Sequence, residues 1–175
     1  MQKNIQLNHA DHKQTNIKFP LSIIANDISS PLNVGSLFRL CDAMGVERLY
    51  LCGQIPLPPN SKISKTSRST EKYVNYESHA DAEALVRTLK KSGAFIIALE
   101  ITSLSIAIDC AEFRQAVIDN KSICLILGAE DAGVSQPLLS LADMTTHIPM
   151  YGNNSSMNVI SAASIACFEI IRNLL

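Results

Sequence analysis

The sequence lacks the features that mark several common classes of protein. Its five cysteines are odd in number and widely scattered, without a Cys-x-x-Cys pair, which argues against a disulfide framework and a zinc site. No apolar run approaches the roughly 18 residues that a membrane helix needs, and residues 1–19 are polar, without a signal-peptide core. We therefore expect a cytoplasmic protein without membrane contact. Its cysteines should be buried, reduced thiols: Cys41, Cys52, Cys110, Cys124 and Cys167.

Common ligand signatures are also missing. The four histidines, His9, His12, His79 and His147, do not have the spacing of metal ligands, so no metal is expected. No Gly-x-Gly-x-x-Gly follows a strand and no Gly-Lys-Ser/Thr loop is present, which argues against an ordinary dinucleotide or ATP site. A small α/β hydrolase is disfavoured because there is no nucleophile elbow.

Positive and negative residues are nearly balanced, with 15 Lys and Arg against 16 Asp and Glu. The formal net charge is −1, so the chain has no global signature of a nucleic-acid binder. One local exception lies at residues 61–72, where Lys62, Lys65, Arg68 and Lys72 are accompanied by a single acid, Glu71. This segment is either a solvated loop or a patch that binds nucleic acid. The second interpretation is favoured if a dimer pairs two such patches.

The chain does contain a clear alternation of apolar runs and amphipathic stretches. This pattern is typical of an α/β fold with a mostly parallel sheet and helices on both faces. We expect a tail at residues 1–20 and one domain at residues 21–175. The expected strands are residues 21–25, 48–52, 95–100, 123–129 and 146–150, with a short one near 73–76. The expected helices are residues 34–44, 80–92, 112–119, 136–142 and 156–174.

The last of these helices, residues 156–174, carries apolar side chains on more than one face. It is therefore not a simple surface helix. It either packs beneath the sheet or forms a subunit interface, and the mixture of small and large residues favours the interface. We expect a homodimer through this helix.

A strand-to-helix junction at residues 148–159 is the strongest sign of a ligand site. It reads Ile-Pro-Met-Tyr-Gly-Asn-Asn-Ser-Ser-Met-Asn-Val. Gly152 is expected to allow a positive φ angle or a close approach, and Ser155, Ser156 or Asn158 can cap the helix that follows. Such a junction directs free backbone N–H groups towards a ligand.

Three motifs together resemble a known family. The first is Pro-Leu-Asn-Val-Gly at residues 31–35, leading to Arg39 and Asp42. The second is Leu-Gly-Ala-Glu-Asp-Ala-Gly-Val-Ser at residues 127–135, and the third is the junction at 148–159. Their order and spacing resemble the signature motifs of the SpoU (TrmH) family of RNA ribose 2′-O-methyltransferases. The resemblance implies a SPOUT fold, in which the later two loops form a C-terminal deep trefoil knot that binds S-adenosylmethionine.

The resemblance also implies which residues bind this cofactor, mostly through their backbone. They are Leu99, Glu100, Gly128, Ile148, Met150, Ser156 and Met157. For Ile148 and Met150, plain core packing is an equally good interpretation. Gly128 is less ambiguous, because a glycine that ends an apolar strand usually marks a turn or a close approach.

The same resemblance implies a catalytic group of Asn33, Arg39, Glu130, Ser156 and Asn158. A buried Glu130 would need a partner, and Arg39 is the natural one; the alternative is a surface glutamate that caps the next helix. Arg39 either takes the proton of the ribose 2′-hydroxyl or grips an RNA phosphate, and the second is physically easier because a guanidinium is not readily deprotonated. Asn33, Ser156 and Asn158, taken singly, could equally be caps or turn formers.

The substrate implied by the resemblance is RNA. The segments at residues 65–74 and 98–102 are more similar to the tRNA guanosine methylases of the family than to its ribosomal-RNA members. Methylation of rRNA is the alternative, and so is a non-catalytic knotted protein that binds RNA or S-adenosylmethionine.

Overall fold

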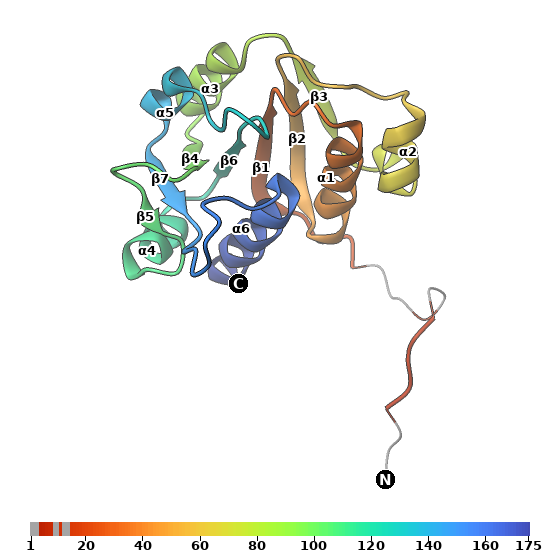
Figure 1. Ribbon diagram of the computed structural model, residues 1–175. Coiled ribbons are helices and arrows are strands. Elements are labelled where there is room, and N and C mark those ends of the chain that lie inside the picture. Colours follow the sequence, from red (N-terminus) through yellow and green to blue (C-terminus); the bar gives the residue numbers. More distant parts are fainter. Residues whose placement is uncertain (1–3, 9–10, 12–14) are drawn as a thin grey trace.

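The protein is described by a computed structural model of residues 4–8, 11 and 15–175 (Figure 1). Within these residues, seven strands form one sheet in the order β3-β2-β1-β6-β4-β7-β5, and every neighbouring pair is parallel. The strands are β1 (Phe19–Asn26), β2 (Val46–Cys52), β3 (Tyr76–His79), β4 (Phe95–Leu99), β5 (Ile106–Ala107), β6 (Ile123–Leu127) and β7 (Met144–His147). The predicted parallel sheet is therefore confirmed.

Helices cover both faces of this sheet, as predicted (Figure 1). The helices are α1 (Pro31–Ala43), α2 (Ser61–Ser67), α3 (Ala82–Lys91), α4 (Ala111–Asp119), α5 (Gln136–Leu141) and α6 (Val159–Leu174), with a short 3₁₀ turn η2 (Thr70–Lys72). The larger core joins one face of the sheet to α1, α4 and α6, where Phe38 and Phe113 are fully buried. The smaller core joins the other face to α3 and α5. The central strand β6 is buried along its whole length, because helices lie on both sides of it.

Three elements were not predicted: helix α2, strand β5 and the 3₁₀ turn η2. Helix α2 occupies the segment expected to be either a solvated loop or an RNA-binding patch, and β5 is a two-residue strand. The sequence of α2 is Ser-Lys-Ile-Ser-Lys-Thr-Ser, in which only Ile63 is apolar, so it has no hydrophobic periodicity to detect. The short strand predicted near residues 73–76 lies later, as β3.

The predicted ends of the elements around the ligand junction were also wrong in part. Strands β4, β6 and β7 stop one to three residues earlier than expected, at Leu99, Leu127 and His147. Pro149 has no N–H to donate to a strand ladder, which is consistent with the early end of β7. Helix α6 begins at Val159 rather than Ser156, because the side chain of Asn158 accepts the hydrogen bond from the Ile160 N–H and caps the helix.

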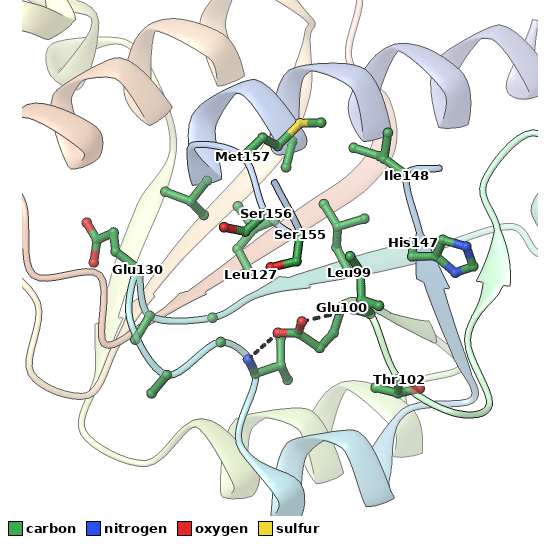
Figure 2. Close-up of a pocket in the computed structure, with 18 of the residues that line it drawn as sticks. Leu99, Glu100, Thr102, Leu127, Glu130, His147, Ile148, Ser155, Ser156 and Met157 are labelled. Atoms are coloured by element: carbon green, nitrogen blue, oxygen red, sulfur yellow. Dashed lines mark hydrogen bonds between the residues drawn. The ribbon is translucent and has the colours of Figure 1, made fainter. Parts of the chain in front are cut away.

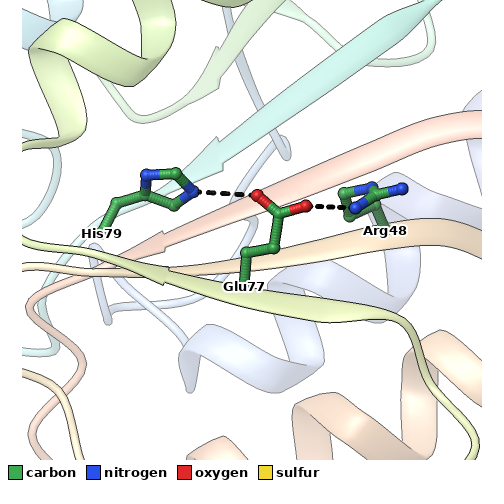
Figure 3. Close-up of polar contacts among 3 residues, drawn as sticks. All are labelled: Arg48, Glu77 and His79. Carbon is green, nitrogen blue, oxygen red and sulfur yellow. Dashed lines mark hydrogen bonds and ion pairs between the residues drawn. The ribbon is translucent and has the colours of Figure 1, made fainter.

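The edge of the sheet at β3 carries a polar cluster of Arg48, Glu77 and His79 (Figure 3). The Glu77 carboxylate lies between the two others and accepts hydrogen bonds from His79 Nε2, if that nitrogen is protonated, at 3.1 Å and from Arg48. The hydrogen bond with His79, and then that from Arg48, lower the pKa of Glu77 below its ordinary value. Charged side chains on an edge strand disfavour pairing with a further strand, so we assign this cluster a structural role.

The cysteines are free thiols, and four of the five are buried, as expected; Cys110 is half-buried. Burial raises the pKa of Cys52, Cys124 and Cys167 to about 12. His9 and His12 lie outside the described residues. In the described part of the chain, no group of three or more His, Cys, Asp or Glu side chains is placed to hold a metal ion, and no helix is long and apolar enough to cross a membrane.

Candidate active site

A cavity of about 710 Å³ lies at the carboxyl ends of β4, β6 and β7 (Figure 2). Four chain segments line it: residues 99–102, residues 127–134 with Leu139, residues 147, 148 and 150, and residues 155–159 with Ala162. All seven predicted cofactor residues are among its lining: Leu99, Glu100, Gly128, Ile148, Met150, Ser156 and Met157. In parallel sheets, ligands bind at this edge, outside the carboxyl ends of the strands.

Two glycines shape the wall of this cavity. A Cβ atom on Gly128 would lie 2.0 Å from the carbonyl carbon of Gly133, so no larger residue fits there without a shift of the backbone. Gly133 has φ +66°, and a Cβ on it would lie 2.2 Å from the Glu100 carboxylate. Ala129 and Gly133 exchange two backbone hydrogen bonds, of 3.1 and 2.9 Å, which close residues 129–133 into a tight turn. The glycine-rich second motif thus folds into a compact loop beside the cavity.

The side chain of Glu100 holds this loop in place. Its two carboxylate oxygens accept hydrogen bonds from the backbone N–H groups of Ile101 and Val134, both at 2.9 Å (Figure 2). The resemblance implied mostly backbone contacts for this residue, so the structural role of its side chain was missed. The sequence did offer a signal for a role of the Glu100 side chain, because a carboxylate that follows a buried strand needs a partner. The same signal drew attention to Glu130.

The turn at residues 151–156 is exposed, and Gly152 does not have the role that was expected of it. Its φ is not positive, and no described atom lies within 4 Å of the place where a Cβ would be. The prediction of a special backbone conformation at Gly152 is therefore wrong. Ser156 lines the cavity, and its hydroxyl makes no hydrogen bond to a described residue.

A polar cluster at one end of the cavity is centred on Glu130. Its carboxylate accepts hydrogen bonds from the backbone N–H groups of Ser29 (2.9 Å) and Ser30 (3.2 Å) and from Asn33 Nδ2 (2.8 Å). Partial burial raises the pKa of this carboxyl, but the hydrogen bonds from Asn33, Ser29 and Ser30 outweigh burial and lower the pKa below its ordinary value. Glu130 is therefore ionised at neutral pH and acts as an acceptor.

The cluster continues from Asn33 to Asn158. Asn33 Oδ1 accepts a hydrogen bond from Asn158 Nδ2 at 3.3 Å, and Asn158 Oδ1 accepts one from the Ile160 N–H at 2.9 Å. An ionised carboxylate can only accept, so it fixes the orientation of the Asn33 amide, and that amide in turn fixes Asn158. The three motifs found in the sequence therefore meet in one ordered hydrogen-bonded chain.

Arg39 does not join this cluster. It is exposed, and it forms no ion pair or hydrogen bond with Glu130 or any other described residue. The predicted Arg39–Glu130 pair is therefore wrong. Six residues of helix turn through about 600°, so Arg39 points about 120° away from Asn33 around α1. It shares the outer face of α1 with Leu32, which is 48% exposed.

The four predicted RNA-binding side chains are exposed on α2 and the turn that follows it: Lys62, Lys65, Arg68 and Lys72. Helix α2 lies directly against α1 (Figure 1). A Cβ on Gly35 of α1 would lie 1.9 Å from Thr66 Oγ1 and 2.5 Å from the carbonyl oxygen of Ile63. This close approach joins the basic segment to the helix that carries Asn33 and Arg39.

Comparison with known proteins agrees with this arrangement. The profile of the SpoU rRNA Methylase family matches residues 20–168, which include all three motifs. The chain belongs to this family. A relative from Thermus thermophilus, named tRNA (guanosine(18)-2′-O)-methyltransferase, is 32% identical over 155 residues, which are 89% of this chain and 76% of the relative.

Solved structures share the fold of this SpoU-family chain. An A. aeolicus TrmH/SpoU tRNA modifying enzyme has a TM-score of 0.75 and 26% identity, covering 89% of this chain and 76% of the other. An AdoMet-bound rRNA methyltransferase from Sinorhizobium meliloti has a TM-score of 0.79 and 23% identity. The match covers 89% of this chain but only 57% of the Sinorhizobium chain, so the latter contains a large part without a counterpart here.

Proposed function

We propose that this protein transfers a methyl group from S-adenosylmethionine to a ribose 2′-hydroxyl of RNA, with tRNA as the favoured substrate. The observation that carries the proposal is the ordered chain Glu130–Asn33–Asn158 at the edge of a ligand-sized cavity. Its members come from three motifs that the SpoU family shares. The names of the relatives support the reaction class, and the Thermus and A. aeolicus proteins support tRNA.

The cavity fits S-adenosylmethionine in size and chemistry. Its volume of about 710 Å³ falls within the roughly 300–1,000 Å³ typical of small-molecule sites. Leu99, Ile148 and Met157 offer apolar surface for the adenine, and the backbone groups at the strand ends offer the donor and acceptor that its edge needs. When bound, this cofactor would supply a methyl group on a positively charged sulfur.

We infer that the loops at residues 128–133 and 148–158 form the deep trefoil knot of the SPOUT fold. Both loops line the cavity, and the relatives with the same fold support this topology. A knot would hold the two loops together and preserve the shape of the cavity between them. Such topologies are rare, so a functional benefit is expected where one occurs.

The chain's own residues then orient the RNA hydroxyl. Asn33 Nδ2 and Asn158 Nδ2 each use one hydrogen in the chain of bonds and keep a second one free. Neutral amides held in this way can position a hydroxyl oxygen without competing for the methyl group. The lowered pKa of Glu130 makes it a poor base at neutral pH, so we assign it to holding Asn33.

A second copy of the chain would give the exposed Arg39 a role at a subunit interface. The outer face of α6 exposes Ile165 (42%) and Phe168 (61%), and α1 beside it exposes Leu32 (48%). We infer that a homodimer covers this apolar face and places Arg39 at the interface, where it can grip an RNA phosphate of either active site. Lys62, Lys65, Arg68 and Lys72 would add phosphate contacts from α2. An enzyme acting on tRNA would work in the cytoplasm.

Calorimetry and methyl transfer test the proposal. S-adenosylmethionine or its demethylated product should bind without added metal. Labelled methyl donor with total tRNA or rRNA, followed by mapping of the label, should place the methyl group on a ribose 2′-oxygen. Label only in rRNA would overturn the tRNA assignment. Cofactor binding without transfer to either RNA would favour the non-catalytic alternative, and no cofactor binding would refute the proposal.

A combined variant of the four basic residues tests the RNA surface. Replacing Lys62, Lys65, Arg68 and Lys72 with Ala should weaken RNA binding across sequences, because contacts to phosphates carry no sequence information. The slope of log affinity against log salt should fall by roughly 0.7 to 1 for each phosphate that the variant no longer neutralises. Unchanged binding and salt dependence would show that the RNA is held elsewhere.

A further inference from the structure

The basic segment, residues 61–72, folds around its single acid. The Glu71 carboxylate accepts hydrogen bonds from the hydroxyls of Ser64, at 3.0 Å, and Ser67. Ser67 is fully buried, and its Oγ also accepts the N–H of Ser69 at 3.2 Å. Glu71 thereby ties the turn after α2 back to the body of that helix.

The turn held in this way has an unusual backbone. Arg68 and Ser69 both have positive φ, of 54° and 70°. Residues other than glycine rarely adopt this left-handed conformation, and two in succession need contacts on either side to hold them. The bonds of Ser67 to Glu71 and Ser69 hold the turn at this point, together with a hydrogen bond of 2.9 Å from the Thr70 hydroxyl to the Ser67 carbonyl.

The fold of the segment separates its charges. Lys62, Lys65, Arg68 and Lys72 are exposed, whereas Glu71 is half-buried and directed at serine hydroxyls. The hydrogen bond from Ser67 is the main cause that lowers the pKa of Glu71, so this acceptor stays ionised at neutral pH. The single acid, Glu71, therefore accepts hydrogen bonds within the segment, while the cations face solvent.

The basic segment is also packed against helix α1. Ile63 is fully buried against α1, and Gly35 allows the two helices to approach until a Cβ would collide with Thr66 and Ile63. The backbone that carries the four cations is thus fixed relative to α1, the helix of Asn33 and Arg39.

We propose that Glu71 is a positioning residue for RNA, which holds residues 61–72 as a preorganised site for backbone phosphates. The inference rests on the proposed RNA substrate. Preorganisation matters because a segment that is already ordered loses less loop entropy on binding. It also reverses the expectation from charge alone, since removing an acid from a basic surface would otherwise strengthen RNA binding.

Three variants of the full-length protein separate these effects. Glu71→Ala removes the charge and both acceptor oxygens. Glu71→Gln removes the charge but keeps one acceptor oxygen for a serine hydroxyl. Glu47→Ala removes the same charge from an exposed residue of β2 whose side chain makes no hydrogen bond to another described residue. Affinity for unmodified tRNA is measured over a series of salt concentrations, with amide hydrogen exchange of each free protein in parallel.

We expect Glu71→Ala to bind RNA several-fold more weakly than Glu47→Ala, with a salt slope reduced by about 0.7 to 1 for each phosphate that is released from the segment. Glu71→Gln should recover most of the affinity. Exchange at the amides of Ser69 and Lys72 should accelerate in Glu71→Ala only. Binding by Glu71→Ala that equals or exceeds that of Glu47→Ala would overturn the inference, as would unchanged exchange. If the wild-type protein binds no RNA, the proposed function fails, and the exchange measurement still tests the role of Glu71 in the segment.

Discussion

Asn33 Nδ2 donates a hydrogen bond of 2.8 Å to the Glu130 carboxylate, although the two residues are 97 positions apart. This contact fixes the orientation of the Asn33 amide, and through it that of Asn158. The Glu130 carboxylate is itself held by the backbone N–H groups of Ser29 and Ser30, so it orients the proposed catalytic group from one end.

Replacing Glu130 should impair catalysis more than cofactor binding. Glu130→Gln loses one of the two acceptor oxygens that serve Ser29, Ser30 and Asn33. We expect kcat to fall by roughly 100-fold, because misplacement of positioning groups by about 1 Å has effects of this size. Asp131→Asn is the matched control, since the neighbouring carboxylate lines the same cavity but makes no hydrogen bond to a described residue. Equal losses in both variants would count against the assigned role.

The lowered pKa of Glu130 predicts a stability difference on the acid side. A group whose pKa is lowered by folding stabilises the protein above its unfolded pKa, and this contribution is lost as the pH falls through the folded value. Wild type should therefore be more stable than Glu130→Gln at pH 7, with the difference shrinking as the pH falls below about 4.3. Thermal unfolding of both proteins between pH 7 and 3 measures this. A difference that does not change with pH would contradict it.

Substitution by alanine should be harmful at Gly128 and harmless at Gly152. At Gly128 a Cβ would lie 2.0 Å from the Gly133 carbonyl carbon, whereas at Gly152 no described atom lies within 4 Å. Gly128→Ala should destabilise the protein by at least about 1–3 kcal/mol, because the backbone must shift, and should abolish cofactor binding. Gly152→Ala should bind the cofactor normally. Calorimetry and thermal unfolding decide between these outcomes.

Arg39→Ala should abolish methyl transfer, because the variant lacks the proposed grip on an RNA phosphate. Cofactor affinity should stay nearly intact, because Arg39 lies outside the cavity and is exposed. Arg39→Lys should also be poor, because an ammonium cannot reproduce the bidentate grip of a guanidinium on phosphate. Single-turnover rates with saturating cofactor provide the measurement. A near-normal rate in the lysine variant would rule out the phosphate clamp.

The proposed dimer predicts a specific effect at Phe168. Phe168→Glu places a charge on the apolar face of α6 and should shift the protein from about twice its chain mass of 19.1 kDa to the monomer. Ile118→Glu is the control, since Ile118 is similarly exposed (55%) but lies on α4. Sedimentation of both variants at low micromolar concentration provides the test. A monomeric wild type would refute the dimer.

The buried strands could be predicted from the sequence because they are continuous apolar runs. All five residues of β6, Ile-Cys-Leu-Ile-Leu, are buried, and such a run between two helical stretches has few other interpretations. Helix α2 and strand β5 could not be predicted. The first has one buried apolar residue, and the second is two residues long and depends on its pairing with β7.

The candidate site was partly predictable for a similar reason. Its residue types and motif order are visible in the sequence, but their partners depend on geometry that no spacing reveals. Glu130 has backbone N–H groups and an asparagine as partners rather than Arg39, because the turn of α1 carries Arg39 away. Glu71 is an ordinary acid in the sequence, and only the folded chain shows that it accepts hydrogen bonds from Ser64 and Ser67.

The long separations within the Glu130–Asn33–Asn158 chain also bear on how the protein becomes active. Asn33 and Asn158 are 125 positions apart, and contacts of this range form late because a long loop must close first. During synthesis, Asn33 and the start of the sheet leave the ribosome well before α6, whose first turn carries the Asn158 cap. A chain that ends before α6 lacks the Asn158 member of the proposed catalytic group, so we expect RNA to be modified only by molecules that have completed folding.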